Sequence, residues 1–247
     1  MQSPDHIHLK AGVQGMQSPD WVPGLCPGLS LLAREAGNIS KEQISMQLFG
    51  KKSRVEIEKL PDGQDRLPPG QYLTKKWPIL SYERTPNGLP ADWKLKISGK
   101  VENPFELTWE ELLALPRTNL TADIHCVTTW SRYDNNWEGV HIREILRRAR
   151  PLPSAQFVMA HSWTGYTTNL PLADLDDDDV MIALKHDGED LEAEHGGPVR
   201  LLVPKLYFYK SAKWLDGLEF MERDHPGFWE QRGYHNHADP WQEERYW

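Results

Sequence analysis

The stretch of sequence that decides how this chain is interpreted is Asp123-Ile124-His125-Cys126-Val127-Thr128-Thr129-Trp130-Ser131. Its first half alternates between apolar and polar residues, which predicts a strand with one buried face. Because successive side chains of a strand point to opposite faces, Ile124 and Cys126 share the buried face and His125 lies on the other. Cys126 is therefore expected to point inward at the end of a strand, just before the polar residues Thr128 and Thr129.

Three interpretations of Cys126 stay open from the residues alone. A free cysteine is most often a small buried apolar side chain. A cysteine nucleophile with His125 as its base is disfavoured, because neighbouring residues of a strand point to opposite faces. A thiolate is also a good ligand for redox-active metals. Since no further ligand set surrounds Cys126 in the sequence, a metal held there would arrive inside an organic cofactor.

Composition narrows the class of protein. The 247 residues, 39% of them hydrophobic and 26% charged, suffice for one domain with an extension. The net charge of −8 argues against a nucleic acid or an anionic membrane as partner. No apolar run reaches the roughly 18–20 residues that span a bilayer, and residues 1–10 lack the features of an export signal. We therefore expect a cytoplasmic protein in which Cys26 and Cys126 are free thiols.

Glycine and proline divide the chain into two parts. Residues 1–60 are polar and often interrupted by these two residue types, which predicts a partly disordered N-terminal extension. Turn residues at 61–70 then lead into a domain expected to span 61–247. Hydrophobic periodicity and caps predict strands at 93–99, 122–126, 157–160, 166–170, 199–203 and 214–220, and helices at 108–115 and 142–149. Strands dominate, so the predicted class is α+β.

A second candidate site consists of the segments His195-Gly196-Gly197-Pro198-Val199-Arg200 and Lys210-Ser211-Ala212-Lys213-Trp214. The two glycines allow the backbone to approach a ligand closely. The basic side chains of His195, Arg200, Lys210 and Lys213 are expected to converge near the ends of one strand in an otherwise acidic protein. They could cradle a phosphate-bearing heteroaromatic cofactor. A Gly-Gly-Pro turn with solvated basic residues is the alternative explanation.

The C-terminal segment is rich in aromatic and polar residues. His235, His237 and Asp239 alternate within it and could bind a metal. A tail packed over the domain, with its polar groups satisfied, explains the same pattern, and we expect this packing rather than a metal site.

Three groups of residues together resemble the sulfite oxidase-type molybdopterin-dependent oxidoreductases, in particular the short single-domain members. They are the Cys126 strand with Trp137-Glu138-Gly139-Val140, the segment His195–Arg200 with Ser211–Trp214, and the segment Trp229–Tyr234. The resemblance spans roughly residues 75–240 and rests on the order and spacing of these motifs. It implies a mixed, β-rich sulfite oxidase-type molybdopterin-binding fold with short helices, and molybdenum and molybdopterin as cofactors.

The resemblance also implies roles for individual residues. Cys126 would ligate molybdenum, and Tyr234 would lie in the active site close to the metal. Contacts with the cofactor are implied for Tyr82, Glu83, His161 or its neighbour Ser162, His195, Arg200, Ser211, Ala212 and Lys213. Lys210 joins this set from its place in the basic segment alone.

The sequence departs from the family pattern around the substrate. Sulfite oxidases place arginines around their anion pocket, where this chain has Leu80-Ser81 and Trp130-Ser131, with Arg84 and Arg132 nearby. Sulfite is therefore disfavoured as a substrate. A pocket walled by Trp130 and Tyr234 would better suit a neutral or larger oxygen donor or acceptor.

The expected function is oxygen-atom transfer by a cytoplasmic molybdenum–molybdopterin oxidoreductase, sulfite oxidase-like or sulfoxide reductase-like, acting on a small molecule. Because the sequence shows no haem or flavin motif, a separate electron-transfer partner is expected. Two alternatives remain: a non-catalytic ligand-binding module on the same scaffold, and a Cys-dependent thiol enzyme.

Overall fold

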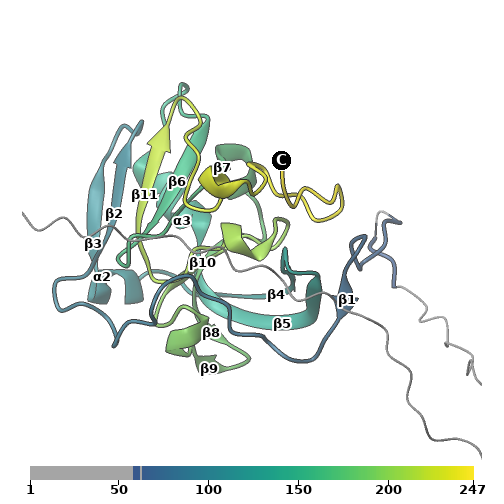
Figure 1. Cartoon of the computed structure of the whole chain (residues 1–247). Helices are drawn as coiled ribbons and strands as arrows, with labels where there is room; N and C mark the ends of the chain where they lie inside the picture. Colours follow the sequence, from purple (N-terminus) through teal and green to yellow (C-terminus); the bar gives the residue numbers. More distant parts are fainter. Residues whose placement is uncertain (1–57, 62) are drawn as a thin grey trace, which may run out of the picture. The chain divides into compact units, whose positions relative to one another are not determined.

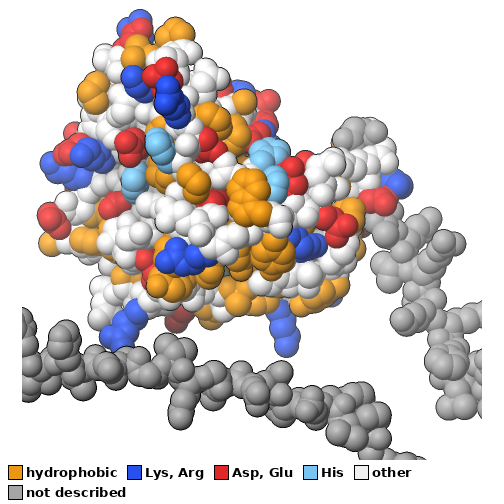
Figure 2. All heavy atoms as spheres, turned by 45° about the horizontal axis from the view of Figure 1, so that its top comes forward, with side chains coloured by type: hydrophobic (Ala, Val, Ile, Leu, Met, Phe, Trp, Pro, Cys, Tyr) orange, Lys and Arg blue, Asp and Glu red, His pale blue; other side chains and the backbone are white. Residues whose placement is uncertain are grey.

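The computed structural model describes residues 58–61 and 63–247, which fall within the second of two compact units, Glu56–Trp247. Cys26 and the predicted N-terminal extension up to residue 57 lie outside the described residues, so the domain boundary at 61 stays a prediction. Within the described part, no helix is long and apolar enough to cross a membrane. Figure 2 shows acidic, basic and apolar side chains interspersed over one face of this part.

One sheet contains β1 Tyr72–Leu73, β4 Thr118–His125, β5 Trp130–His141, β8 Met181–His186, β9 Glu189–Asp190 and β10 Arg200–Leu202. Its path runs β1-β5-β8-β10, with β4 paired to β5 and β9 paired to β8. The long strand β5 is antiparallel to β4 and β8 and parallel to β1. β4 and β5 form a hairpin whose turn begins at Cys126, so this sheet presents the cysteine at one of its ends.

The second sheet has the order β3-β2-β11-β6-β7. Its strands are β2 Lys94–Gly99, β3 Phe105–Thr108, β6 Phe157–Ser162, β7 Thr167–Pro171 and β11 Leu215–Met221. The short helices are α2 Trp109–Leu113, α3 Ile142–Ala149 and α4 Leu172–Leu175. In Figure 1 this sheet stands at the upper left, and the β4–β5 hairpin curves below it.

Strand alternation divides the core into two clusters. Ile182 and Leu201 face the larger cluster, which the six-stranded sheet shares with the five-stranded sheet. Their neighbours Met181 and Leu202 face a smaller cluster that also contains Cys126. Because β10 alternates in the same way, Arg200 shares the face of Leu202 and is directed toward the side of the sheet on which Cys126 lies.

Several predicted elements are confirmed. The alternating residues at 93–99 form β2, and the helix predicted at 142–149 is α3. Thr108 caps α2 with both hydrogen bonds of a capping box, one from the backbone N–H of Glu111 to the Thr108 hydroxyl and the other from the Thr108 N–H to the Glu111 carboxylate. With strands in the majority and three short helices among the described residues, the α+β class is confirmed.

The sequence did not predict β5 or β8. In β5 the polar residues Ser131 and Asn135 are fully buried, which breaks the alternation expected of a half-buried strand. Asn135 donates to the carbonyls of Ala122 and Arg132, and Ser131 lies 2.8 Å from the imidazole of His125. Tertiary hydrogen bonds thus permit polar residues inside a strand that the pattern alone could not reveal.

Candidate active site

A cavity of about 520 Å³ lies where the β4–β5 turn, the segment before β10, the segment after β10 and the C-terminal loop meet. Predicted site residues on its wall are Tyr82, Glu83, Cys126, His195, Arg200, Ser211, Lys213 and Tyr234. Most of the residues assigned to the site from sequence are therefore brought to one cavity from distant parts of the chain.

The β4–β5 turn holds Cys126 by backbone hydrogen bonds. The Cys126 N–H donates to the carbonyl of Trp130 over 2.8 Å, and the Thr129 N–H donates to the carbonyl of Cys126 over 3.0 Å. Thr129 has a φ of 77°, which the tight turn requires. The sulfur lies 3.1 Å from the Thr128 hydroxyl, and burial raises the pKa of the thiol. Burial therefore favours the protonated thiol when no metal is bound.

His125 is not available as a base for Cys126. Its Nδ1 lies 2.8 Å from the hydroxyl of Ser131, and its ring packs edge-on against Trp241. Burial lowers the pKa of His125 to about 4. As the strand alternation predicts, it lies away from the cavity wall to which Cys126 contributes.

Arg200 and Lys213 are two cations on the cavity wall whose donors are directed to carbonyls. Arg200 is 1% exposed and donates to the carbonyls of His195 and Ser211, and burial lowers its pKa to about 9. Lys213 donates to the carbonyls of Leu80 and Glu194, and burial lowers its pKa to about 7. Among the described residues neither forms a salt bridge with a carboxylate. Two cations that lack a carboxylate partner and lie on one wall would attract an anionic group bound in the cavity.

Aromatic rings form much of the remaining wall. Trp77 stacks on His195 with 3.8 Å between ring centroids, and Arg200 lies 4.1 Å from the centre of the Phe208 ring. Burial lowers the pKa of His195 to about 4, so its imidazole is neutral near pH 7. Flat rings beside the cations fit a heteroaromatic group that carries a phosphate. The wall therefore fits the cofactor implied by the sequence.

The structure shows a packing role for Gly196 and Gly197 that the sequence did not predict. A Cβ at Gly197 would lie 1.8 Å from the carbonyl oxygen of Leu191, and one at Gly196 would lie 2.9 Å from the Cβ of Lys213. Gly196 also has a φ of 100°. These glycines allow the chain to approach itself closely and to bring Lys213 to the wall.

Tyr234 reaches the cavity from the C-terminal loop. Its ring packs against Trp229, with 4.8 Å between ring centroids. It also packs edge-on against Tyr209 and Tyr246, with centroid distances of 5.3 Å and 5.1 Å. Burial raises the pKa of its phenol. Tyr234 is therefore a protonated hydrogen-bond donor at neutral pH on the wall that also carries Cys126.

Tyr82 and Glu83 lie at the cavity on the segment that precedes β2. Tyr82 is 62% exposed and packs on Phe228, with 4.1 Å between ring centroids. Glu83 accepts a hydrogen bond from Thr164, whose hydroxyl lies 2.7 Å from that of Ser162. Ser162, the alternative to His161, is thus connected to the site through Thr164.

Three predicted cofactor contacts do not line this cavity. His161 lies in a separate hollow of the five-stranded sheet, 3.1 Å from the carboxylate of Glu219. Lys210 is fully buried and uses its three donors on the Glu230 carboxylate and the carbonyls of Asn169 and Asn236. Ala212 is buried, and its carbonyl accepts from the Leu201 N–H.

The C-terminal histidines take part in packing interactions. His237 lies 2.8 Å from the Glu244 carboxylate and 3.1 Å from Asp174, and His235 is 3.3 Å from Glu244. Among residues 58–61 and 63–247 no group of three or more histidine, cysteine or acidic side chains is arranged to hold a metal ion. The expectation of a packed tail agrees with these contacts.

Sequence reasoning missed four aromatic residues of the wall: Trp77, Tyr166, Phe208 and Tyr209. A signal was present for two of them, because the run Leu206-Tyr207-Phe208-Tyr209 directly precedes the basic residues that were singled out. Neither Arg84 nor Arg132 lines the cavity. Arg132 instead forms a salt bridge of 2.7 Å with Asp187.

Comparison with known proteins adds independent information. The family model of the oxidoreductase molybdopterin binding domain matches residues 82–229. An uncharacterized oxidoreductase of Bacillus subtilis is 44% identical over 186 residues, which cover 75% of this chain and 94% of that protein. The catalytic subunit of a protein-methionine-sulfoxide reductase from Campylobacter jejuni is 27% identical over 183 residues, which cover 65% of this chain and 59% of that protein.

A solved structure also matches. The sulfane dehydrogenase SoxCD of Paracoccus pantotrophus aligns with a TM-score of 0.51 and 26% identity, over 61% of this chain and 44% of that chain. The chain thus spans nearly all of the Bacillus protein but less than two thirds of the sulfoxide reductase subunit and less than half of the sulfane dehydrogenase chain.

Proposed function

This chain belongs to the family of oxidoreductases with a molybdopterin binding domain, and we propose that it transfers an oxygen atom to or from a neutral sulfur compound beside Cys126. The observation that carries the assignment of the cavity is a pair of cations, the buried Arg200 and the half-buried Lys213, on the same wall as an inward-facing thiol. An anion-binding wall and a soft metal ligand are the two features that a molybdopterin site needs.

Individual residues of this chain would hold the cofactor. Cys126 would supply the thiolate, Arg200 and Lys213 would bind the phosphate, and His195 with Ser211 would contact the pterin. When bound, the molybdenum–pterin group supplies two-electron redox chemistry at the point where oxygen is gained or lost. The aromatic wall excludes water from one side of the cavity and so strengthens the electrostatic attraction of both cations for the phosphate.

Tyr234 would act on the substrate as a hydrogen-bond donor. Its pKa is raised by burial, so the phenol stays protonated at neutral pH. A donor held by three neighbouring rings can stabilise negative charge that develops on a substrate oxygen, and it can supply a proton to that oxygen.

The cavity wall favours a neutral substrate. Trp130, Trp229 and Tyr234 provide apolar surface, and the arginines nearby in sequence, Arg84 and Arg132, are absent from the wall. The only cations on the described wall are Arg200 and Lys213, which the cofactor phosphate would neutralise. A relative named as a protein-methionine-sulfoxide reductase subunit supports a sulfoxide as the substrate class. We therefore propose sulfoxide reduction rather than sulfite oxidation.

The test is a comparison of two reactions catalysed by cofactor-loaded protein. Reduction of methionine sulfoxide by reduced viologen dye should be faster than oxidation of sulfite by ferricyanide. Tyr234→Phe should lower kcat for the sulfoxide by about 100-fold, the lower range for loss of a positioned proton donor. Turnover of sulfite with no turnover of sulfoxides would overturn the proposed substrate class.

The source of electrons and the location of the protein in the cell are two further proposals. The relative from Campylobacter jejuni is named as a catalytic subunit, which supports a separate electron-transfer partner for this chain as well. We also propose a cytoplasmic location. Fractionation of cells that carry the native gene tests the location, and a dye-free assay with added cell extract tests the need for a partner.

A further inference from the structure

We propose that Arg245 is a positioning residue that fixes the turn carrying Cys126 relative to the loop carrying Tyr234. The proposed function enters only in naming these two residues as catalytic, because the contacts themselves exist in the chain without cofactor. Arg245 lies near the C-terminus, far in sequence from the turn that it holds.

The guanidinium of Arg245 connects two backbone segments. Its Nη1 donates to the carbonyl of Val127 over 2.7 Å, and its Nη2 donates to the carbonyl of Pro69 over 3.2 Å. Val127 directly follows Cys126 in the turn. The preceding carbonyl, that of Cys126, accepts a hydrogen bond of 3.0 Å from the Gln71 side chain. Arg245 and Gln71 therefore tie the turn to the segment 69–71.

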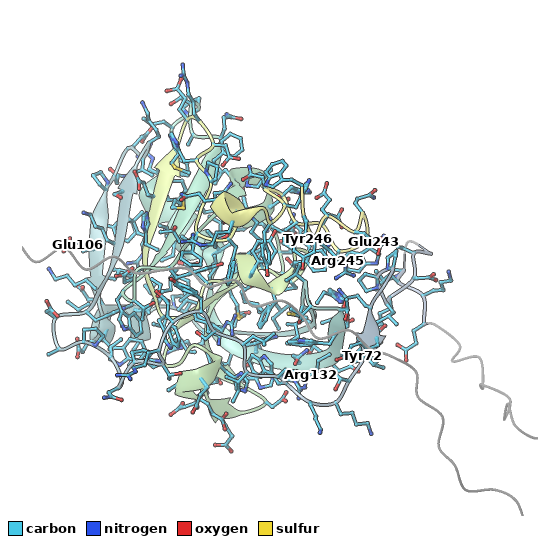
Figure 3. All side chains as sticks on the ribbon, in the orientation of Figure 1. Tyr72, Glu106, Arg132, Glu243, Arg245 and Tyr246 are labelled. Carbon is cyan, nitrogen blue, oxygen red and sulfur yellow. The ribbon has the colours of Figure 1, made fainter. Side chains whose placement is uncertain are left out.

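The backbone of the same C-terminal segment holds the Tyr234 loop. The carbonyl of Arg245 accepts from the His235 N–H over 3.1 Å, and the Trp247 N–H donates to the carbonyl of Gly233 over 3.1 Å. Tyr234 and Tyr246 form a β-bridge and pack edge-on. Figure 3 shows Glu243, Arg245 and Tyr246 together, on the side of the molecule where Tyr72 of β1 lies. Arg245 thus contacts the Cys126 turn through its side chain and the Tyr234 loop through its backbone.

The backbone at Gly70 lies so close to the guanidinium of Arg245 that little room is left for a side chain at position 70. A Cβ at Gly70 would lie 2.7 Å from the carboxylate of Glu243 and 3.1 Å from Nη2 of Arg245. The guanidinium also lies 5.0 Å from the centre of the Tyr207 ring. No salt bridge of Arg245 with a carboxylate is present in the described part of the chain. Its donors are directed to carbonyls, and two donors in a fixed planar fork suit that task better than the single nitrogen of a lysine.

The test measures alkylation of Cys126 by iodoacetamide in the full-length, metal-free chain, with peptides resolved by mass spectrometry so that Cys26 is counted separately. The variants are Arg245→Met and Arg245→Lys. Arg143→Met is the matched control, because Arg143 is an exposed arginine that pairs with Asp176 and Asp178 away from the cavity. Arg245→Met removes a charge-assisted hydrogen bond from the turn, so Cys126 should react about tenfold faster than in the parent.

Whether Cys126 is alkylated faster or more slowly in the variants distinguishes opening of the turn from the loss of a charge. Loss of a positive charge near a thiol disfavours the thiolate and by itself slows alkylation, so faster reaction reports opening of the turn. Arg245→Lys keeps the charge but cannot bridge both carbonyls, and it should also react faster than the parent. Parental rates in Arg245→Met, or full restoration by lysine, would overturn the proposal.

Hydrogen exchange separates a local effect from general destabilisation. In Arg245→Met, amides of 126–130 and 233–236 should exchange faster while those of α3 keep parental rates. Equal acceleration throughout the domain would show a merely structural role and would also overturn the proposal. Both readouts use metal-free protein, so failure of the proposed oxygen-atom transfer would leave these results unchanged.

Discussion

The indole of Trp77 stacks on the imidazole of His195, with 3.8 Å between ring centroids and 16° between ring planes. The ring centroid of Trp77 also lies 5.5 Å from that of Trp137 and 4.4 Å from that of His186. One tryptophan from the segment before β2 therefore fixes the ring of a residue assigned to the cofactor from its motif, and it connects the cavity wall to the smaller core cluster.

Replacing Trp77 by leucine should weaken retention of the cofactor. The change removes the stack on His195, and such ring pairs contribute roughly 0.5–1.5 kcal/mol beyond area burial, which corresponds to about a two- to tenfold loss of affinity. Pterin remaining after extended dialysis, measured by fluorescence, provides the readout. Trp77→Phe keeps a ring and should retain more pterin than Trp77→Leu. Equal retention by the parent and Trp77→Leu would contradict this role.

Anion binding by the metal-free protein should depend on the protonation of Lys213. Its pKa is lowered by burial to about 7, so the cationic form is lost as the pH rises through that value. Sulfate does not titrate in this range and His195 is already neutral, so the affinity for sulfate should fall on the order of tenfold between about pH 6 and about pH 8. Calorimetric titration measures this change.

Lys213→Met should bind sulfate more weakly than the parent below about pH 7, should approach the parental affinity at higher pH, and should show little pH dependence. Lys205→Met is a suitable control, since Lys205 forms salt bridges with Asp174 and Asp177 and is absent from the cavity wall. The same pH dependence in Lys213→Met as in the parent would assign the titration to another group.

The Lys210–Glu230 pair should act on stability rather than on cofactor binding. Both side chains are fully buried and 2.5 Å apart, and removing one partner of such a pair costs about 3–5 kcal/mol. Lys210→Met should lower the free energy of unfolding in urea by this amount, and adding Glu230→Met should restore most of it. Molybdenum per folded molecule should stay at the parental level. A selective loss of molybdenum would show that Lys210 contacts the cofactor.

The predictable part of the fold is the part whose local pattern agrees with its tertiary environment. β2 alternates and buries Leu95 and Ile97, and α2 begins at a capping box, so both could be read from the sequence. β5 could not, because its buried Ser131 and Asn135 find their partners on β4. Pairing with a neighbouring strand, rather than its own pattern, makes this segment a strand.

The site residues, too, could be predicted only where the local sequence pattern determines the direction of the side chain. Cys126, Arg200 and Lys213 reach one cavity because strand alternation and the Gly-Gly approach direct them there. Lys210 lies three residues from Lys213 but occupies the 3-10 turn Phe208–Lys210, from which its side chain enters the interior. The contact of Trp77 with His195 joins distant segments and has no local signature.

The central claim is that Cys126 supplies a sulfur ligand to molybdenum, and X-ray absorption at the molybdenum edge tests it most directly. The parent and Cys126→Ser would be produced in a host that makes molybdopterin and compared after metal analysis. We expect molybdenum in the parent and one sulfur ligand fewer in whatever molybdenum the variant retains. A parent that stays free of molybdenum, or a variant with the full parental sulfur coordination, would contradict it.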